Sequence, residues 1–218
     1  MAQPFPCSIP LPDGFQQGRQ QQPDMQRCND PSSAKLWETM SITSRLVGSS
    51  VPDVSLASTS GRSIDLSSLG AGRTVIYCYP RTSEPGKPAP TDWDIIPGAR
   101  GCTPQACSFR DHHAEIAKAG AAVFGLSTQT TAYQQEMVVR LHLPFEVLSD
   151  ERLAFADALS LPTFLADGMR LIERMTFILR GGVIEQVFHP ITHPERNAAD
   201  TLEWLAAHPI SNSRFQSA

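Results

Sequence analysis

The sequence predicts an α/β fold in which a central mixed sheet is flanked by helices. Short apolar segments alternate with segments of helical periodicity between residues 73 and 159, which is typical of parallel strands joined by crossover helices. Two further apolar segments then surround a Gly-Gly turn, and a helical segment follows them. The chain has 218 residues, of which 41% are hydrophobic, so it can bury a sizeable core.

The expected elements follow one another in a regular order. The expected strands are residues 51–56, 63–66, 73–79, 122–127, 145–148, 171–179 and 183–188, and the expected helices are residues 103–119, 132–141, 153–159 and 198–207. Pro80 ends the third strand, because proline has no N–H for a sheet ladder. Thr103 is a good N-cap, Pro104 suits the first helical position, and Gly120 suits the end of that helix. A βαβ portion followed by a hairpin and a last helix predicts a thioredoxin-like fold.

The two ends of the chain differ from this core in composition. Residues 1–32 are rich in Pro and Gln with few periodic apolar positions, which predicts an irregular extension. Residues 33–47 carry an apolar stripe and are expected to form a short docking helix. We therefore expect an N-terminal extension with a docking helix at residues 1–46, a thioredoxin-like domain at 47–210 and a C-terminal tail at 211–218.

Charge and hydropathy argue against several classes of protein. The 18 basic and 22 acidic residues are scattered and give a formal net charge of -4, so nucleic acid is not an expected partner. No segment approaches the roughly 18 consecutive apolar residues of a membrane span, and the first residues lack the pattern of a signal peptide. The protein is therefore expected to be cytoplasmic, with no membrane partner.

Five cysteines point to redox chemistry rather than to structural disulfides. Their number is odd and low for a secreted disulfide scaffold, so at least one thiol must be free or intermolecular. Cys78 lies inside an apolar strand and is expected to be a core residue. Cys7 and Cys28 lie in the extension and are expected to be unpaired. Cys102 and Cys107 lie at the start of a helix and are the candidates for chemistry.

The places of Cys102 and Cys107 in the expected helix predict different roles. Cys102 lies where the positive end of the helix dipole and free N–H groups favour a thiolate. Cys107 lies about 7.5 Å further along a continuous helix and is turned by about 140°, whereas a disulfide needs Cα atoms within about 7 Å. If the pair reacts, the first turns of the helix must unwind. His112 and His113 point about 100° apart, so a zinc site with these cysteines is not expected.

Several segments of the chain are together similar to one family. They are Tyr79-Pro80, Gly101-Cys102-Thr103, Cys107, Phe109-Arg110-Asp111, residues 124–127, residues 143–150, and Arg174 to Phe177 with the Gly-Gly turn that follows. In this order they resemble the peroxiredoxins, specifically the Q type that is also called bacterioferritin comigratory protein. The resemblance covers residues 47–207.

This resemblance implies a thiol-dependent peroxidase. Cys102 would attack a hydroperoxide substrate and become a sulfenic acid, with which Cys107 would condense to a disulfide. Thioredoxin or glutaredoxin would reduce that disulfide, so neither a metal nor an organic cofactor is implied. Arg174 would match the family's active-site arginine, which favours the thiolate and stabilises charge on the displaced oxygen. The protein is expected to be a monomer or a homodimer.

The loop before Cys102 departs from the family pattern. The family carries Thr or Ser three residues before this cysteine, whereas this chain has Ala99, so Thr82, Ser83 or Thr103 is expected to supply the hydroxyl. An apolar insertion at residues 87–100 also precedes the cysteine. The candidate substrate-binding residues are Pro80, Thr82, Trp93, Ala99, Gly101 and Thr103.

The insertion at residues 87–100 leaves more than one function open. An apolar cover over the site predicts a preference for bulkier organic hydroperoxides, or a substrate that is not a peroxide. One alternative is therefore an enzyme on the same scaffold that performs another thiol-based or biosynthetic reaction. The other is a non-enzymatic redox sensor.

Overall fold

The centre of the protein is a mixed sheet of seven strands. The computed structural model describes residues 42–210, and residues 1–41 and 211–218 lie outside this part. The strands of the sheet are β1 (Ser55–Ser58), β2 (Ser63–Asp65), β3 (Arg73–Cys78), β4 (Ala121–Ser127), β5 (Val147–Ser149), β8 (Met175–Arg180) and β9 (Val183–Phe188). Their spatial order is β2-β1-β5-β4-β3-β8-β9. β3, β4 and β5 are parallel, and the other pairs are antiparallel.

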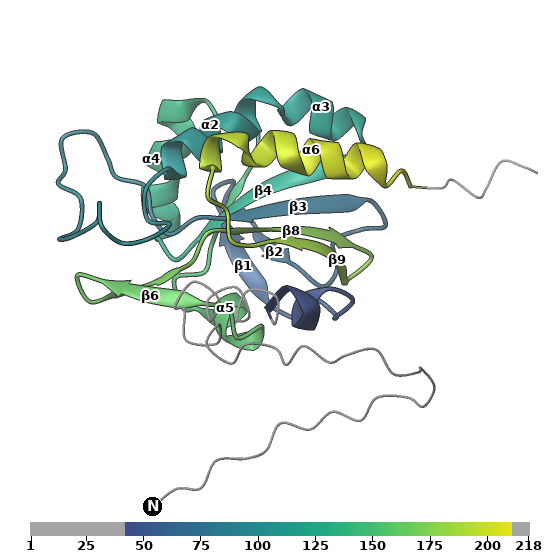
Figure 1. Cartoon of the computed structure of the whole chain (residues 1–218), viewed down its shortest axis with the longest axis horizontal. Coiled ribbons are helices and arrows are strands. Elements are labelled where there is room, and N and C mark those ends of the chain that lie inside the picture. The colour runs from purple at the N-terminus through teal and green to yellow at the C-terminus, as the bar shows by residue number, and fades with distance from the viewer. Residues whose placement is uncertain (1–41, 211–218) are drawn as a thin grey trace, which may run out of the picture.

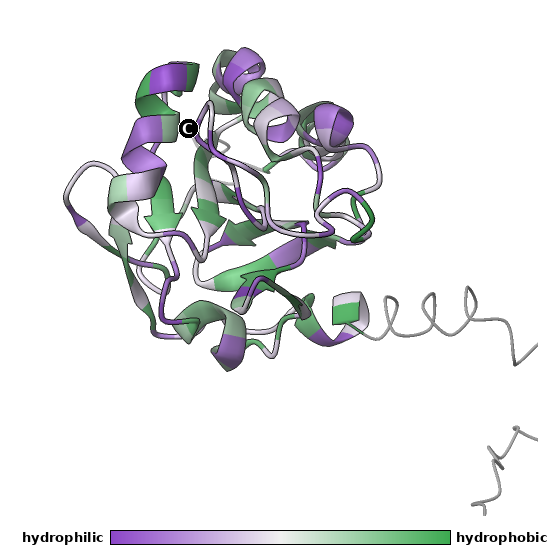
Figure 2. Ribbon diagram, turned by 90° about the vertical axis from the view of Figure 1, so that its left-hand side faces the viewer, coloured by the Kyte–Doolittle hydropathy of each residue, from purple (hydrophilic) through white to green (hydrophobic). Residues whose placement is uncertain are grey.

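Helices cover both faces of this sheet, as the sequence predicted (Figure 1). One face carries α2 (Cys102–Asp111), α3 (His113–Lys118), α4 (Thr131–Leu141) and α6 (Asn197–Ala207), which the short helix η2 (Pro194–Arg196) precedes. The other face carries α5 (Ala154–Ala158) and the helical residues 42–46. Hydrophobic strands therefore lie between two layers of more polar helices (Figure 2).

The central strand β3 shows why two covered faces are needed. All six of its residues are buried, which is the pattern of a strand with helices on both sides. Tyr77 points to the α2 side, and its ring stacks on Phe109 with a centroid distance of 4.5 Å. This contact fixes α2, the helix that begins at Cys102, against the middle of the sheet.

The helix after the long loop begins earlier than predicted. Thr103 was the expected N-cap, but Gly101 occupies that place and Cys102 is the first helical residue. The reason is that the N–H of Gln105 donates to the carbonyl of Gly101 at 3.0 Å, which closes the first turn. The expected single helix at residues 103–119 is also wrong, because His112 leaves helical geometry and separates α2 from α3.

The single strand predicted at residues 171–179 is also wrong, because it is two strands in different sheets. β7 (Met169–Ile172) pairs with β6 (Thr163–Ala166), which the sequence did not predict, in a separate antiparallel hairpin. β8 instead pairs with β3 in the main sheet. The chain changes sheets at Glu173 and Arg174, so Arg174 lies at a strand boundary rather than inside a strand.

The described part begins in the region of the predicted docking helix. Residues 42–46 are helical, and Leu46 is packed in the core. Arg45 donates to the carbonyls of Leu159 and Ser160 at 2.9 and 3.1 Å, which ties this turn to the end of α5. Cys7, Cys28, most of the predicted docking helix and the C-terminal tail lie outside the described residues. The predicted division into extension, domain and tail stays a prediction.

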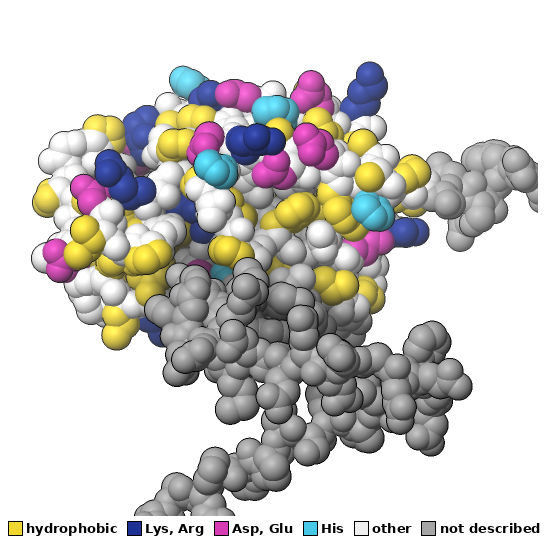
Figure 3. Space-filling view, in the orientation of Figure 1, with side chains coloured by type: hydrophobic (Ala, Val, Ile, Leu, Met, Phe, Trp, Pro, Cys, Tyr) yellow, Lys and Arg dark blue, Asp and Glu magenta, His cyan; other side chains and the backbone are white. Residues whose placement is uncertain are grey.

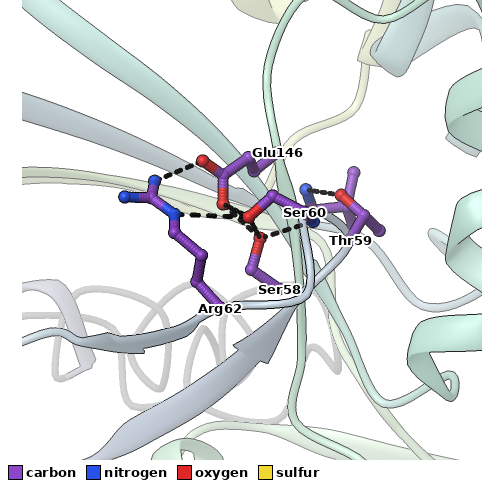
Figure 4. Close-up of polar contacts among 6 residues, drawn as sticks. Ser58, Thr59, Ser60, Arg62 and Glu146 are labelled. Atoms are coloured by element: carbon purple, nitrogen blue, oxygen red, sulfur yellow. Dashed lines mark hydrogen bonds and ion pairs between the residues drawn. The ribbon is translucent and has the colours of Figure 1, made fainter.

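A polar cluster around Glu146 joins the β1–β2 turn to the start of β5 (Figure 4). The Glu146 carboxylate accepts from the hydroxyl of Ser60 at 2.8 Å, and it also accepts from Ser58 and Arg62. The hydroxyl of Thr59 accepts from the first backbone N–H of β5 at 3.0 Å. Burial opposes ionisation, but the hydrogen bonds outweigh it and lower the pKa of Glu146.

Candidate active site

Cys102 lies buried at the N-terminus of α2. Its side chain is on the face of the helix that packs on the sheet, and only 4% of the residue is exposed. Gly101 adopts a φ of 100° as the N-cap residue, so the long loop can turn sharply into the helix. The Sγ atom of Cys102 lies 3.5 Å from the carbonyl oxygen of Ala99. The positive end of the α2 dipole lies at Cys102, whereas the Ala99 carbonyl accepts a hydrogen bond from the thiol.

Arg174 brings a positive charge to the same sulfur. Its Nη2 atom lies 3.2 Å from Sγ of Cys102, and the residue is 3% exposed. The same nitrogen lies within hydrogen-bonding distance of the carbonyls of Gly98, Ala99 and Arg100, at 3.2, 3.3 and 2.9 Å. The guanidinium therefore places a cationic N–H donor within hydrogen-bonding distance of the sulfur. Three loop carbonyls thus hold the guanidinium in place beside Cys102.

Gln105 is a residue of this site that the sequence reasoning missed. Its side-chain oxygen accepts from Nη1 of Arg174, and the residue is fully buried. Gln105 lies three residues after Cys102, so both side chains are on one face of α2. A polar residue at that spacing from a candidate nucleophile was the signal that could have identified it.

A cavity of about 280 Å³ opens beside Cys102. Five of the six predicted substrate-binding residues line it, namely Thr82, Trp93, Ala99, Gly101 and Thr103. The sixth, Pro80, is buried at the end of β3 and is not among the lining residues. The structure therefore brings most of the predicted substrate-binding residues to one cavity, with the sulfur in its wall.

The residues with hydroxyl groups around the cavity are held differently. Thr82 is held by Gln129, which accepts from its backbone N–H at 2.9 Å and from its hydroxyl at 3.3 Å. The amide of Gln129 donates back to the carbonyl of Thr82 at 3.0 Å. Ser83 and Thr103 also line the cavity. Ala99 has no hydroxyl, and its backbone carbonyl accepts from Sγ of Cys102 at 3.5 Å.

The insertion at residues 87–100 forms the outer wall of the cavity. Trp93 lies with its ring centroid 6.2 Å from that of Phe164 on β6, so the insertion packs against the small hairpin. Ile95 is 76% exposed. Figure 3 shows hydrophobic side chains on the surface of this part of the molecule. The outer wall is mixed in character, because Trp93 lines it together with Asp94 and Arg100, which form an ion pair at 3.2 Å.

Cys107 lies on the same helix as Cys102, at a partly exposed position. Both are free thiols, and α2 is continuous between them. A disulfide between the two residues therefore requires the first turns of α2 to open. Cys78 is different, because it is fully buried in the core on the other face of the sheet. Burial raises the pKa of the Cys78 thiol well above its ordinary value, which confirms its interpretation as a core residue.

Two wider features of the described residues concern metals and membranes. Within residues 42–210, no three His, Cys, Asp or Glu side chains gather in a group that could hold a metal ion. No helix in the described part of the chain combines the length and apolar character needed to span a membrane.

Comparison with protein families matches residues 46–202 to the family described as Redoxin. A putative chloroplastic peroxiredoxin Q from Oryza sativa subsp. indica is 32% identical over 159 residues, which are 72% of this chain and 65% of that protein. The chain thus spans just under two thirds of this relative. Chloroplastic peroxiredoxin Q from Sedum lineare is 31% identical over 159 residues, or 72% of this chain and 76% of that protein. Chloroplastic peroxiredoxin Q from Arabidopsis thaliana is 30% identical over 161 residues, which are 73% of this chain and 67% of that protein.

Solved structures show the same architecture. The chain superposes on peroxidoxin BcpB from Mycobacterium tuberculosis with a TM-score of 0.62 and 25% identity, over 75% of this chain and 97% of that one. It superposes on a peroxiredoxin Q from Xanthomonas campestris with a TM-score of 0.61 and 24% identity, over 76% of this chain and 99% of that one. The predicted thioredoxin-like fold class, with helices flanking a mixed sheet, is confirmed.

Proposed function

Because the chain belongs to the Q-type peroxiredoxins of the redoxin family, we propose that it is a thiol-dependent peroxidase in which Cys102 reduces the hydroperoxide. The observation that carries this proposal is the contact of 3.2 Å between Nη2 of Arg174 and Sγ of Cys102. It occurs at a helix N-terminus, in the wall of a cavity of about 280 Å³. A thiolate held in this way has access to a small substrate and a donor for the oxygen that leaves.

In the proposed reaction, the Cys102 thiolate attacks the terminal oxygen of a hydroperoxide. The S–O bond forms as the O–O bond breaks, so the sulfur is oxidised by two electrons to sulfenic acid. The displaced oxygen takes a proton and leaves as water or an alcohol. Arg174 donates to the oxygen on which negative charge develops. The hydroxyls of Thr82, Ser83 and Thr103 are the candidates for orienting the peroxide.

Cys107 is proposed to complete the oxidative half of the cycle. Its sulfur attacks the sulfenic acid, a disulfide forms, and water leaves. The intact helix between the two cysteines means that α2 opens before this step. A thiol reductant then restores both thiols, and we propose thioredoxin or glutaredoxin for this role. A cytoplasmic location and a monomeric or homodimeric state stay predictions.

We further propose that the site prefers organic hydroperoxides. The support is the indole of Trp93, which lines the cavity and packs towards Phe164. The bacterioferritin comigratory protein of Xanthomonas campestris, whose fold this chain shares, has alkyl peroxide reduction activity. If Trp93 contacts the organic group, Trp93→Ala lowers kcat/KM for cumene hydroperoxide about tenfold while that for hydrogen peroxide changes little. A parent protein with no higher kcat/KM for cumene hydroperoxide than for hydrogen peroxide contradicts the preference, and a ratio of the two values that the substitution leaves unchanged contradicts the role of Trp93.

Peroxide consumption tests the function itself. The reduced protein is supplied with a dithiol reductant and hydrogen peroxide or cumene hydroperoxide, and turnover is compared with that of Cys102→Ser and Cys107→Ser. Turnover should vanish in Cys102→Ser. After one equivalent of peroxide, Cys107→Ser should retain a sulfenic acid on Cys102 that dimedone labels. Oxidation of Cys102 no faster than that of a free cysteine would favour the alternatives, a repurposed enzyme or a redox sensor.

A further inference from the structure

A buried chain of polar side chains continues from the active site to the start of α6. Gln105 accepts from Arg174 with its side-chain oxygen and donates with Nε2 to Oδ1 of Asn197 at 2.9 Å. The hydroxyl of Thr176 donates to the same Oδ1 at 2.7 Å. Exposure is 0% for Gln105 and Thr176, 1% for Asn197 and 3% for Arg174. These buried hydrogen bonds thus join three elements, α2, β8 and α6.

The direction of these side-chain hydrogen bonds decides whether Gln105 can accept from the Arg174 guanidinium. Arg174 has only donors, so Gln105 must present its oxygen to Arg174 and its amino group to the other side. Asn197 supplies an oxygen at that other side, and Thr176 donates to the same oxygen. A buried amino group without an acceptor costs about 1–3 kcal/mol. Without the Asn197 oxygen, Gln105 would have to turn to satisfy its amino group and would release Arg174.

The segment that carries Asn197 is held closely against α2. Gly101 lies so near Pro194 that a Cβ atom at residue 101 would be 2.6 Å from Cγ of Pro194. Asn197 follows Pro194 by three residues and is the first residue of α6. The oxygen of Asn197 is therefore placed by the same packing that holds the N-terminus of α2 and Cys102.

We propose that Asn197 is a positioning residue for Arg174 and acts through the side-chain amide of Gln105. The inference rests on the proposed function, because it assigns Arg174 the task of activating Cys102. Asn197 touches neither the sulfur nor the cavity, and its effect is to keep Gln105 in the orientation that accepts from the guanidinium. The same three-residue link couples the start of α6 to the reactivity of the cysteine.

The test is the pH profile of Cys102 alkylation, which needs no peroxide. In a full-length Cys107→Ser background, iodoacetamide labelling of Cys102 is followed by mass spectrometry from pH 5 to pH 10. Asn197→Leu should move the midpoint of the profile upward by about one pH unit, which lowers the rate at pH 6 about tenfold. Asn197→Asp, which keeps an oxygen acceptor, should stay within about threefold of the parent. Thr201→Val is the matched control, because it removes a buried hydroxyl of α6 that donates to the backbone carbonyl of Asn197 and leaves the Asn197 side chain in place.

A second background separates positioning from a general structural effect. Gln105→Glu replaces the amide by a carboxylate, which offers two acceptors to Arg174 and has no amino group that needs Asn197. In that background Asn197→Leu should change the rate at pH 6 by less than about threefold. An equal shift in both backgrounds, or no shift in the parent, overturns the proposal. If Asn197→Leu does not fold, Asn197→Ser takes its place, because the serine side chain is too short for its oxygen to reach Gln105.

Peroxide turnover of the same substitutions, made in the protein that keeps Cys107, separates the two claims. A shifted alkylation profile in a protein without peroxidase activity would refute the proposed function and support the role of Asn197. If the protein is an active peroxidase and Asn197→Leu leaves its alkylation profile unchanged, the role of Asn197 is refuted and the proposed function is not.

Discussion

Gly101→Ala should destabilise the protein more than an ordinary substitution of a glycine with positive φ. Gly101 has a φ of 100°, and its missing side chain leaves room for Pro194. A Cβ atom would lie 2.6 Å from Cγ, 3.0 Å from Cβ and 3.6 Å from Cδ of that ring. The substitution therefore combines a backbone penalty with a steric clash between α2 and the segment before α6.

The two penalties can be estimated separately. A left-handed conformation costs a residue with a side chain roughly 1–2 kcal/mol, and the clash adds about 1–3 kcal/mol. The lower entropy of alanine in the unfolded chain returns about 0.4–1 kcal/mol. The free energy of unfolding should thus fall by about 2–4 kcal/mol. Gly98 provides the control, because its φ is 79° and nothing lies within 4 Å of the place of its Cβ.

Urea denaturation in reducing buffer measures the difference. Gly98→Ala should lose only about 0.5–1.5 kcal/mol, which is the backbone penalty less the entropy that alanine returns, with no clash. Pro194→Ala removes the nearest atom and should recover part of the loss in the Gly101→Ala protein. Equal losses for the two glycine variants, or no recovery with Pro194→Ala, would refute the argument that the ring closes over residue 101.

Two further substitutions test the packing and the polar cluster away from the active site. Glu146→Gln should lower the free energy of unfolding by about 1–2 kcal/mol at pH 7. Because the pKa of Glu146 is lowered in the folded state, its contribution is present above the ordinary value of about 4.3 and is lost as the pH falls through the folded-state value. The difference between Glu146→Gln and the parent should be larger at pH 7 than at pH 3, and the same difference at both would contradict this assignment. Tyr77→Phe should change stability by less than about 1 kcal/mol, because the buried hydroxyl has no hydrogen-bond partner in the part of the chain that the structure describes. A loss above about 2 kcal/mol in thermal or urea unfolding would mean that this hydroxyl is satisfied.

Local patterns in the sequence predicted the βαβ order and the position of Cys102 because these depend on neighbouring residues. Pro80 ends the strand, and the helix follows at once after the long loop. The start of the helix was placed two residues too late because Thr103 is a better N-cap by type than Gly101. The backbone geometry that makes Gly101 the cap depends on the hydrogen bond from Gln105, which residue preferences do not describe.

The two strands between residues 169 and 180 show a different limit. Apolar residues lie on both sides of Glu173 and Arg174, and the sequence analysis placed this charged pair inside one strand instead of at a change of sheet. Only the pairing of β8 with β3 reveals it. The same change of sheet places Arg174 beside Cys102, a contact between residues 72 positions apart. The resemblance to a family identified this arginine, and spacing alone could not.

The sequence did not predict the role of Asn197. It lies 92 positions from Gln105, at the start of a helix that the sequence located only by its apolar stripe. A buried asparagine at a helix N-terminus resembles any capping residue by type. Its link to Arg174 follows from three-dimensional packing, which no local pattern encodes.

The central claim is that Arg174 makes Cys102 reactive towards peroxides. The most direct measurement is the rate of Cys102 oxidation when the reduced protein is mixed with hydrogen peroxide in a stopped-flow instrument, followed by tryptophan fluorescence and compared with Arg174→Gln. Loss of the donor that stabilises the departing oxygen should lower the second-order rate constant by about 10²–10³. Alkylation by iodoacetamide at pH 9 should fall far less, because that reaction needs only a thiolate. A variant that reacts with peroxide as fast as the parent would contradict the claim.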